Sequence, residues 1–485
     1  MRSFIENHNA ARRNAYHELP SDLREHHGIE QTVLAGGYGY RQVMELIQNG
    51  ADAILEAHEH GMPHASSNRV HVLLQESSLY VANTGAPLSE DGVDALLSSH
   101  SSPKRGNQIG RFGLGFKSLL RLGGPIDLFT SASGAIRFDP ARCRDDLKRD
   151  FNVIEAPGLR LAWPLEESER RCDIVLGQFE WAETIVRVKV QTHEILDHLR
   201  KEIHDFPAEF LLFFPVPTTL LLDDGRKQPR EIKIEPNGND WQLYDGSEMS
   251  SWRVAKRDIS IVDVHAVSDA THIHARDSVP LAWAIPLEGK REEAGRFWAF
   301  FPTHTPTYLP GILNAPWKLN SDRNAIIGGE WNTAMMREAA RLIVEILPQL
   351  HTDADPGRLL DAFPRQLERK DEDAAPLVEE LWNAIESAAV VPDATGALRP
   401  ARELWRHPLN NTELARHWQS LADGDELAQI VHPSCLERQR ISRLNGLAER
   451  LKPKGTEQTS CPNLRLRATT IWFSSVASIQ TEKAF

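Results

Sequence analysis

The sequence predicts a mixed α+β protein that is built from three successive regions. Residues 1–160 alternate helical and strand patterns, residues 161–330 are mostly strand-like, and residues 331–485 are mainly helical. At 485 residues the chain is long enough for two or three domains. We therefore expect an N-terminal α/β sandwich, a strand-rich α/β middle domain and a mainly helical C-terminal region.

The composition is that of a globular protein with an acidic balance. Hydrophobic residues make up 41% of the chain, charged residues 25%, and the net charge is −13. This charge argues against binding of nucleic acid through a positive field over the whole surface, although a local basic patch remains open. The four cysteines form no Cys-x-x-Cys pair, as expected of free thiols in a reducing compartment. Neither a signal peptide nor a membrane span is indicated, so we expect a cytoplasmic protein with no membrane partner.

A helical period over residues 40–60 places an apolar face opposite a polar one. The apolar face carries six residues, namely Val43, Leu46, Ile47, Gly50, Ala51 and Ile54. Glu45, Asn49 and Asp52 are spaced i, i+4 and i+7 on the other face. Asn49 offers a neutral oxygen that suits Mg²⁺, and Glu45 could accept a proton from a water that attacks a phosphate. Taken alone, such a face is more typical of a solvated helix.

Two further motifs follow along the chain. Strand patterns at 70–74 and 79–82 lead into Asn83-Thr84-Gly85, which by itself is an ordinary turn. A Ser-rich stretch then precedes glycines at positions 110, 113 and 115 and an apolar helical pattern. Such glycines let backbone N–H groups face phosphates, and the following helix N-terminus adds its positive dipole end. Residues 98–118 are long and polar enough to form a mobile lid.

In this order the three motifs resemble the nucleotide-binding motifs of the GHKL, or Bergerat-fold, ATPases. That superfamily includes the ninety-kilodalton heat-shock chaperones, type II topoisomerases, MutL and histidine kinases. The segment at 109–118 is similar to the heat-shock-chaperone form, and more similar still to the sacsin-type form, in its letters IGRFGLGFKS. The resemblance is specific for about residues 40–130 and looser for 150–330.

The resemblance implies that residues 1–160 form a Bergerat-type sandwich that holds ATP or ADP with Mg²⁺ between helices and a curved sheet. Glu45 would be the general base and Asn49 the Mg²⁺ ligand. Because histidine kinases generally lack this glutamate, Glu45 favours hydrolysis over phosphotransfer to a histidine. The implied nucleotide contacts are Asn49, Asp52, Ala53, Asn83, Gly85, Leu88, Ser102, Lys104, Gln108, Gly110, Arg111, Phe112, Gly113, Leu114, Gly115, Phe116 and Lys117.

A second-domain cation completes the expected site. Residues 319–323, Leu-Asn-Ser-Asp-Arg, resemble the chaperone middle-domain segment whose arginine reaches the γ-phosphate. An arginine from another domain can neutralise transition-state charge and report that ATP is bound. Arg323 is the first candidate and Lys318 the second; the alternative is that Arg323 is an ordinary surface-loop residue.

The chain departs from the family pattern at the base-binding position. Asn83 stands where the family has an aspartate, and Pro87 replaces the second glycine of that motif. An amide can accept a hydrogen bond from adenine, but it can also donate one, so base preference is open. The threonine that supports adenine binding in the family has no match near residues 159–161.

Three functions follow from these patterns. The first is Mg²⁺-dependent ATP binding with slow hydrolysis, which drives lid closure and a conformational change on an unknown partner or client protein, in the manner of chaperone-type ATPases. The second is a nucleotide-gated binding or sensor subunit of a bacterial defence assembly with little turnover. The third and weaker is DNA processing like that of MutL or topoisomerases, and the acidic charge makes nucleic acid an unexpected partner. Related ATPases often dimerise, so a homodimer is a further expectation.

Residues 210–214 are expected to form a buried strand, and residues 1–30 a short helical lead-in.

Overall fold

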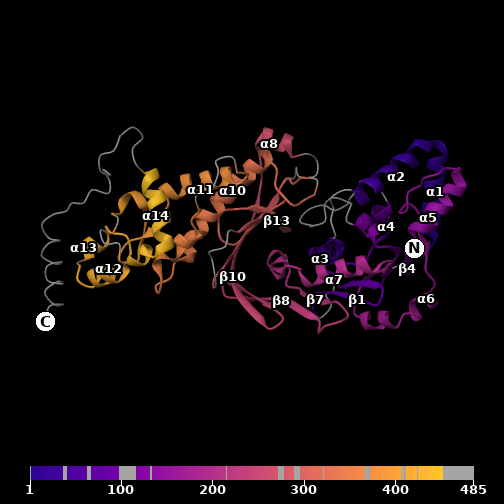
Figure 1. Ribbon diagram of the computed structural model, residues 1–485, viewed down its shortest axis with the longest axis horizontal. Helices are drawn as coiled ribbons and strands as arrows, with labels where there is room; N and C mark the ends of the chain where they lie inside the picture. The colour runs from indigo at the N-terminus through magenta and orange to yellow at the C-terminus, as the bar shows by residue number, and fades with distance from the viewer. Residues whose placement is uncertain are drawn as a thin grey trace.

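The computed structural model describes residues 2–35, 41–62, 67–97, 116–131, 134–214, 216–270, 278–288, 295–320, 322–365, 372–405, 407, 411–422 and 424–451. Both helices and strands are abundant, which confirms the predicted α+β class. The N-terminal helices lie at one end of the molecule, a long curved sheet runs through its middle, and the C-terminal helices lie at the other end (Figure 1). Within the described residues, no helix is both long and apolar enough to cross a membrane.

The N-terminal lead-in is two full helices, α1 (Arg2–Glu18) and α2 (Pro20–Ala35), so the expectation of one short helix was wrong. Pro20 starts the second helix, where its missing N–H costs nothing. The Asn9 side chain fixes α1 by donating to the Ala162 carbonyl at 2.7 Å and accepting from the Ala162 N–H at 3.3 Å. Both helices are too polar for hydrophobic periodicity to reveal them, because much of their surface faces solvent.

The first half of the sheet has the strand order β1-β2-β6-β3-β4-β5, and every neighbouring pair in it is antiparallel. Its strands are β1 (Arg69–Gln75), β2 (Ser78–Asn83), β3 (Gly123–Thr130), β4 (Gly134–Phe138), β5 (Trp163–Pro164) and β6 (Thr184–Val190). The hairpin β1–β2 is the one the sequence predicts. Helices α5 (Pro140–Phe151) and α6 (Glu167–Arg171) lie in the connections between β4 and β6.

Side-chain alternation gives this half of the sheet two buried faces. Leu79 and Val81 of β2 join a large core with four helical elements, namely α3 (Gln42–Glu59), α4 (Glu90–Leu97), η1 (Phe116–Leu122) and α7 (His193–His204). Tyr80 and Ala82 point the other way and pack against Phe179 of η2 (Ile174–Phe179). The candidate site residues of α3 therefore lie over the face of the sheet that carries Leu79 and Val81.

A parallel pairing of β1 with β7 joins this half to a second one, which makes a single 14-stranded sheet. The added strands are β7 (Thr219–Asp223), β8 (Arg230–Asn237), β9 (Asp240–Asp245), β10 (Glu248–Ile259), β11 (Val279–Pro286), β12 (Arg296–Ala299), β13 (Phe301–Pro306) and β14 (Ile312–Asn314). The short helix α8 (Val264–Asp269) follows β10. The division at residue 160 stays an interpretation, since β6 lies beyond it in sequence but between β2 and β3 in space.

The predicted strand at 210–214 is wrong. These residues belong largely to a buried 3₁₀ segment, η3 (Ala208–Phe213), in which Phe210 stacks on Phe301 with 4.9 Å between ring centroids. A short apolar run fits a buried helical turn as well as a buried strand, and Pro207 at the start favours the turn.

From residue 330 to residue 451, the described part of the chain is mainly helical with one small hairpin. Its elements are α10 (Glu330–Ile346), η4 (Leu347–Leu350), η5 (Pro356–Ala362), α11 (Ala375–Ser387), β15 (Ala389–Pro392), β16 (Leu398–Pro400), η6 (Ala401–Glu403), α12 (Thr412–Gln419), α13 (Gly424–Leu427), η7 (Pro433–Leu436) and α14 (Arg438–Arg450). These elements share a second core with β10 and β11.

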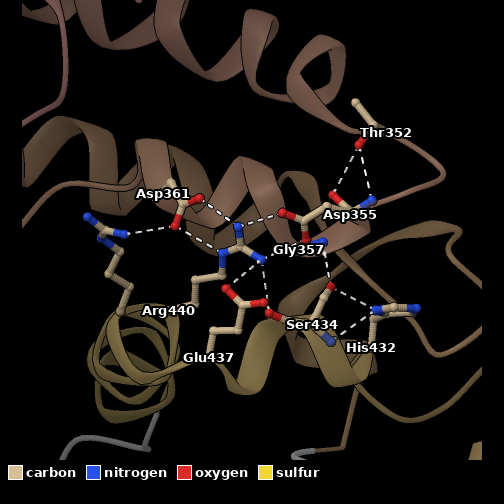
Figure 2. A network of polar contacts seen from close by, with 9 residues as sticks. Thr352, Asp355, Gly357, Asp361, His432, Ser434, Glu437 and Arg440 are labelled. Atoms are coloured by element: carbon tan, nitrogen blue, oxygen red, sulfur yellow. Dashed lines mark hydrogen bonds and ion pairs between the residues drawn. The ribbon is translucent and has the colours of Figure 1, made fainter. Parts of the chain in front are cut away.

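A buried arginine ties the end of this region together (Figure 2). The Arg440 guanidinium donates to Asp355 at 2.7 Å and to Asp361 at 2.7 and 2.9 Å. The neighbouring Ser434 hydroxyl bonds His432 Nδ1 at 2.8 Å, but it also accepts from the buried Gly357 N–H at 2.7 Å. Ser434 and His432 therefore stabilise a buried turn, and the Ser434 hydroxyl is not exposed as a nucleophile would be.

Candidate functional site

Helix α3 carries the predicted polar face on a well-packed base. Its apolar residues Val43, Ile47 and Ile54 are buried in the main core, as the period predicts. Glu45 and Asn49 are half-buried, and Asp52 is only 3% exposed. The Glu45–Asn49–Asp52 face is therefore recessed and is not an ordinary solvated surface.

Arg323 reaches this face from the segment between β14 and α10. Its Nη1 lies 3.6 Å from the Glu45 Oε1, and the two side chains are only 20% and 14% exposed. The Arg323 carbonyl also accepts from Arg41 Nη1 at 3.3 Å. The structure thus brings together two catalytic candidates that are far apart in sequence.

The loop that presents Arg323 is organised by Asn320. The Asn320 Oδ1 accepts from the backbone N–H groups of Asn324 and Ala325 at 3.0 and 3.3 Å, and its carbonyl accepts from the Arg323 N–H at 3.0 Å. Arg323 has a φ of 54°, a left-handed conformation that costs free energy in a non-glycine residue. A strained residue held by a well-bonded loop is typical of a functional position.

Lys318, the second cationic candidate, contacts Asp269 and not Glu45. Its ammonium donates to the Asp269 carbonyl at 2.8 Å and to the Asp269 carboxylate at 2.5 Å, at the end of α8. Its backbone N–H donates to Asn332 Oδ1 at 2.9 Å. Lys318 therefore anchors the base of the loop, and Arg323 is the cation that lies at Glu45.

The turn after β2 docks directly on α3. The Ala86 N–H donates to the Ala53 carbonyl at 2.8 Å. Gly85 has a φ of +114°, and a Cβ there would lie 2.5 Å from backbone atoms of Ala53 and Ile54. A Cβ on Gly50 would likewise meet the Asn83 Cβ at 3.1 Å. Two motifs that the sequence shows separately therefore form one junction.

Asn83 has a fixed orientation at this junction. The residue is 5% exposed, and its Nδ2 donates to the Thr84 carbonyl at 2.8 Å. This bond uses one N–H of the amide and fixes its orientation, and among the described residues none donates a hydrogen bond to its Oδ1. Toward a ligand, Asn83 presents an acceptor, as an aspartate would.

Thr184 and Thr130 continue the row from Asn83 across the sheet. Thr184 is the cross-strand partner of Asn83 on β6, and Thr130 is the partner of Thr184 on β3. Cross-strand partners share a face, so both threonines lie on the α3 side. The Thr130 Oγ1 is buried and has no hydrogen-bond partner among the described residues. Sequence reasoning sought a threonine near 159–161 and missed Thr184, because strand register is not local information.

The remaining predicted contacts divide into two groups. Leu88 packs on the main core, and Phe116 packs edge-to-face on Phe138 with 5.0 Å between ring centroids. Lys117 is only 1% exposed, and burial lowers its pKa to about 8. Nine predicted residues lie outside the described residues: Ser102, Lys104, Gln108, Gly110, Arg111, Phe112, Gly113, Leu114 and Gly115.

Glu202 of α7 is a further residue beside the site that the sequence did not single out. Arg41, the N-cap of α3, makes no side-chain cap, and the Glu202 Oε1 accepts from the Met44 N–H at 2.9 Å instead. The Glu202 Oε2 is buried and has no partner in the described part of the chain. Burial, with a smaller contribution from the nearby Glu45, raises the pKa of this carboxyl to about 8.

Acidic and histidine side chains do not converge into a metal site here: no group of three or more His, Cys, Asp or Glu suited to a metal occurs in the described ranges. The described cysteines Cys143, Cys172 and Cys435 are free thiols, as expected. No protein-family model matches this chain, and no curated protein matches it. Functional inference therefore rests on the site itself.

Proposed function

We propose that the chain is a Mg²⁺-dependent ATPase of the GHKL class, with a Bergerat-type N-terminal domain that cleaves the β–γ phosphoanhydride of ATP. The observation that carries this proposal is the meeting of Glu45 with Arg323, 3.6 Å apart on the recessed face of α3. The docking of the Asn83–Gly85 turn on the same helix supports it, because it joins a base-binding motif to a catalytic one.

In this proposal each residue has a distinct role. Glu45 takes the proton of the attacking water, and Arg323 offsets the charge that develops on the phosphoryl oxygens. With no phosphate present, Arg323 pairs with Glu45. When Arg323 moves to a phosphate, Glu45 is released to act as the base, so nucleotide binding itself would switch on the chemistry.

A divalent metal would bind beside Glu45. Mg²⁺ usually keeps several waters and takes phosphate oxygens, so it needs few protein ligands. Asn49 lies one turn from Glu45 on the same half-buried face and would supply one neutral oxygen. The metal would neutralise phosphate charge and orient the phosphate chain.

The base site supports adenine. Asn83 offers its Oδ1 as an acceptor, and the bond from its Nδ2 to Thr84 fixes the orientation of the amide. The exocyclic amino group of adenine is a donor, whereas guanine has an acceptor carbonyl at that place, which would oppose the Asn83 Oδ1. Thr184 and Thr130 extend the polar row on the same face.

Steady-state ATPase assays on Glu45→Ala, Asn49→Ala and Arg323→Ala test the proposal, with Glu59→Ala as the matched control. Glu59 is an exposed carboxylate at the end of the same helix. We expect each of the first three changes to lower kcat by about 100-fold or more and the control to leave it unchanged. Unchanged turnover in both Glu45→Ala and Asn49→Ala would refute the function.

The ion pair also favours a second candidate, a nucleotide-gated binding module with little turnover. Glu45 held by Arg323 cannot act as a base until the pair opens. If the pair persists with nucleotide bound, the protein would bind ATP or ADP tightly and release almost no phosphate. Equilibrium binding combined with a phosphate-release assay separates the two functions.

A further inference from the structure

We propose that His8, Arg12 and Arg160 form a second, buried site that binds an oxyanion of the phosphate class. None of its three residues lies on α3, and it does not depend on the ATPase proposal. It lies where α1 packs along residues 156–162, close to the end of α4.

The packing of α1 places the three side chains together. Asn9 bonds the Ala162 backbone in both directions, which sets the face of α1 that meets this stretch. His8 and Arg12 are four residues apart and therefore neighbours on the helix. His8 Nδ1 contacts Asp94 of α4 at 3.1 Å, and the Arg160 Nη1 donates to the carbonyl of Leu97 at 2.8 Å, so α4 closes the same region.

Arg160 is the anomaly in this region. Its side chain is 0% exposed, yet its Nε and Nη2 have no hydrogen-bond partner among the described residues. The Arg12 Nε and the His8 Nε2 are also buried and without a partner there. A buried guanidinium is costly unless an anion pairs with it, so the three unmatched N–H donors of Arg160 and Arg12 indicate a missing acceptor.

The nearby carboxylates do not supply that acceptor. Glu30 is fully buried, and its two oxygens accept from the N–H groups of Gly158 at 2.6 Å and Leu159 at 3.0 Å. Asp94 is 55% exposed and pairs with His8. The Tyr16 hydroxyl bonds His26 Nδ1 at 2.8 Å. Burial lowers the pKa of Arg160 and Arg12 adds to this, while Tyr16 and Glu30 raise it without offsetting the effect of burial.

The geometry of the open donors selects the ligand. Nε and Nη2 form one edge of the guanidinium, and two parallel N–H groups on such an edge bind two oxygens of one oxyanion. The Arg12 Nε adds a further positive donor, and His8 lies beside it with a pKa that burial and Arg12 lower. Lys117 lies near enough to Arg160 for the two charges to interact. This much positive charge favours a phosphate group over a single carboxylate.

The experiment measures thermal unfolding of the full chain with sodium phosphate against sodium chloride at equal ionic strength. We expect phosphate to raise the Tm of the wild type by about 3–5 °C at saturation. Arg160→Met should lose this response, and its Tm without phosphate should equal or exceed that of the wild type, because an unpaired buried charge has been removed. Arg142→Met is the matched control, since Arg142 is an exposed arginine of the same region that lies over Trp163.

Further arms separate the sources of the phosphate group and guard against misfolding. A response to ADP but not to inorganic phosphate, lost in Arg160→Met, would identify the phosphate group as that of a nucleotide. A phosphate response that survives in Glu45→Ala and Asn49→Ala would separate this site from the proposed ATPase site. Arg160→Lys keeps the charge but loses the bidentate edge, so it should fold and respond more weakly. The proposal is overturned if Arg160→Met responds like the wild type, or if no phosphate-bearing probe raises the Tm.

Discussion

Glu202 shows at the scale of one residue how burial couples the fold to pH. Its carboxyl caps the N-terminus of α3 and has a pKa raised to about 8 from 4.5 by burial. The folded state therefore holds a proton that the unfolded chain has lost above pH 4.5. The stability linked to this group is complete below about pH 4.5 and falls as the pH rises to about 8.

Glu202→Gln should remove this pH dependence. Glutamine keeps the acceptor for the Met44 N–H but cannot ionise. Relative to the wild type, the variant should be more stable at pH 9 than at pH 5, by roughly 4 kcal/mol at most. Urea unfolding at the two pH values measures this, with the exposed Glu194→Gln on the same helix as the control. A difference that is the same at both pH values would show that Glu202 is ionised throughout.

At the scale of elements, the junction of β2 with α3 depends on Gly85. The residue combines a positive φ with a close approach to the α3 backbone, so an added Cβ meets atoms that cannot move easily. Gly134 offers a matched comparison, since it also has a positive φ of +96° but nothing within 4 Å of an added Cβ.

Gly85→Ala should therefore cost more than Gly134→Ala. We expect about 1–2 kcal/mol from the backbone conformation in both variants, and about 2 kcal/mol more from the clash in Gly85→Ala. Urea unfolding curves of the two variants and the wild type give the difference. Equal losses would mean that the turn can move away from α3 without cost, and that the junction does not define the site.

Local sequence patterns were sufficient to predict the helix and strands that carry the site. They were insufficient to predict which of these elements contact one another in the fold. The period of α3 and the alternation of β1 and β2 are properties of short windows, so their existence and faces were predicted. The partnership of Asn83 with Thr184 depends on strand register, and Arg323 reaches Glu45 only through the path of the whole sheet. The polar helix α1 and the orphaned Arg160 left no pattern in the sequence, because a buried cation looks like a surface residue in composition.

The C-terminal helices depend on one cation for their arrangement. Arg440 is 6% exposed in its side chain and bridges Asp355 and Asp361, which lie at either end of η5 (Figure 2). Arg440→Met should leave the Asp355 carboxylate without its ion pair and Asp361 with only the Arg443 contact at 3.4 Å. We expect a cost of about 2–4 kcal/mol, less than for a fully buried pair because both aspartates are partly exposed. Hydrogen exchange should rise in η5, η7 and α14 and stay unchanged in α3. An equal rise in α3 would show that the two cores open together.

At the scale of the whole molecule, the Glu45–Arg323 pair connects the first half of the sheet to the segment that follows the second. The two residues are partly exposed and 3.6 Å apart, so a double-mutant cycle with Glu45→Gln and Arg323→Gln should give a coupling of only about 0.5–1 kcal/mol without nucleotide. Lys318 with Asp269 serves as a control pair that holds the same loop from its other side.

Nucleotide should change this coupling in a way that a static surface pair would not. If Arg323 transfers from Glu45 to a phosphate, saturating ADP or a non-hydrolysable ATP analogue should reduce the Glu45–Arg323 coupling toward zero while leaving the Lys318–Asp269 coupling intact. Arg323 would exchange a weak ion pair with Glu45 for a stronger contact with the phosphate. The position of the loop that carries Arg323 would therefore depend on whether nucleotide is bound. A coupling that is unchanged by bound nucleotide would mean that Arg323 fastens the two parts of the molecule and takes no part in sensing.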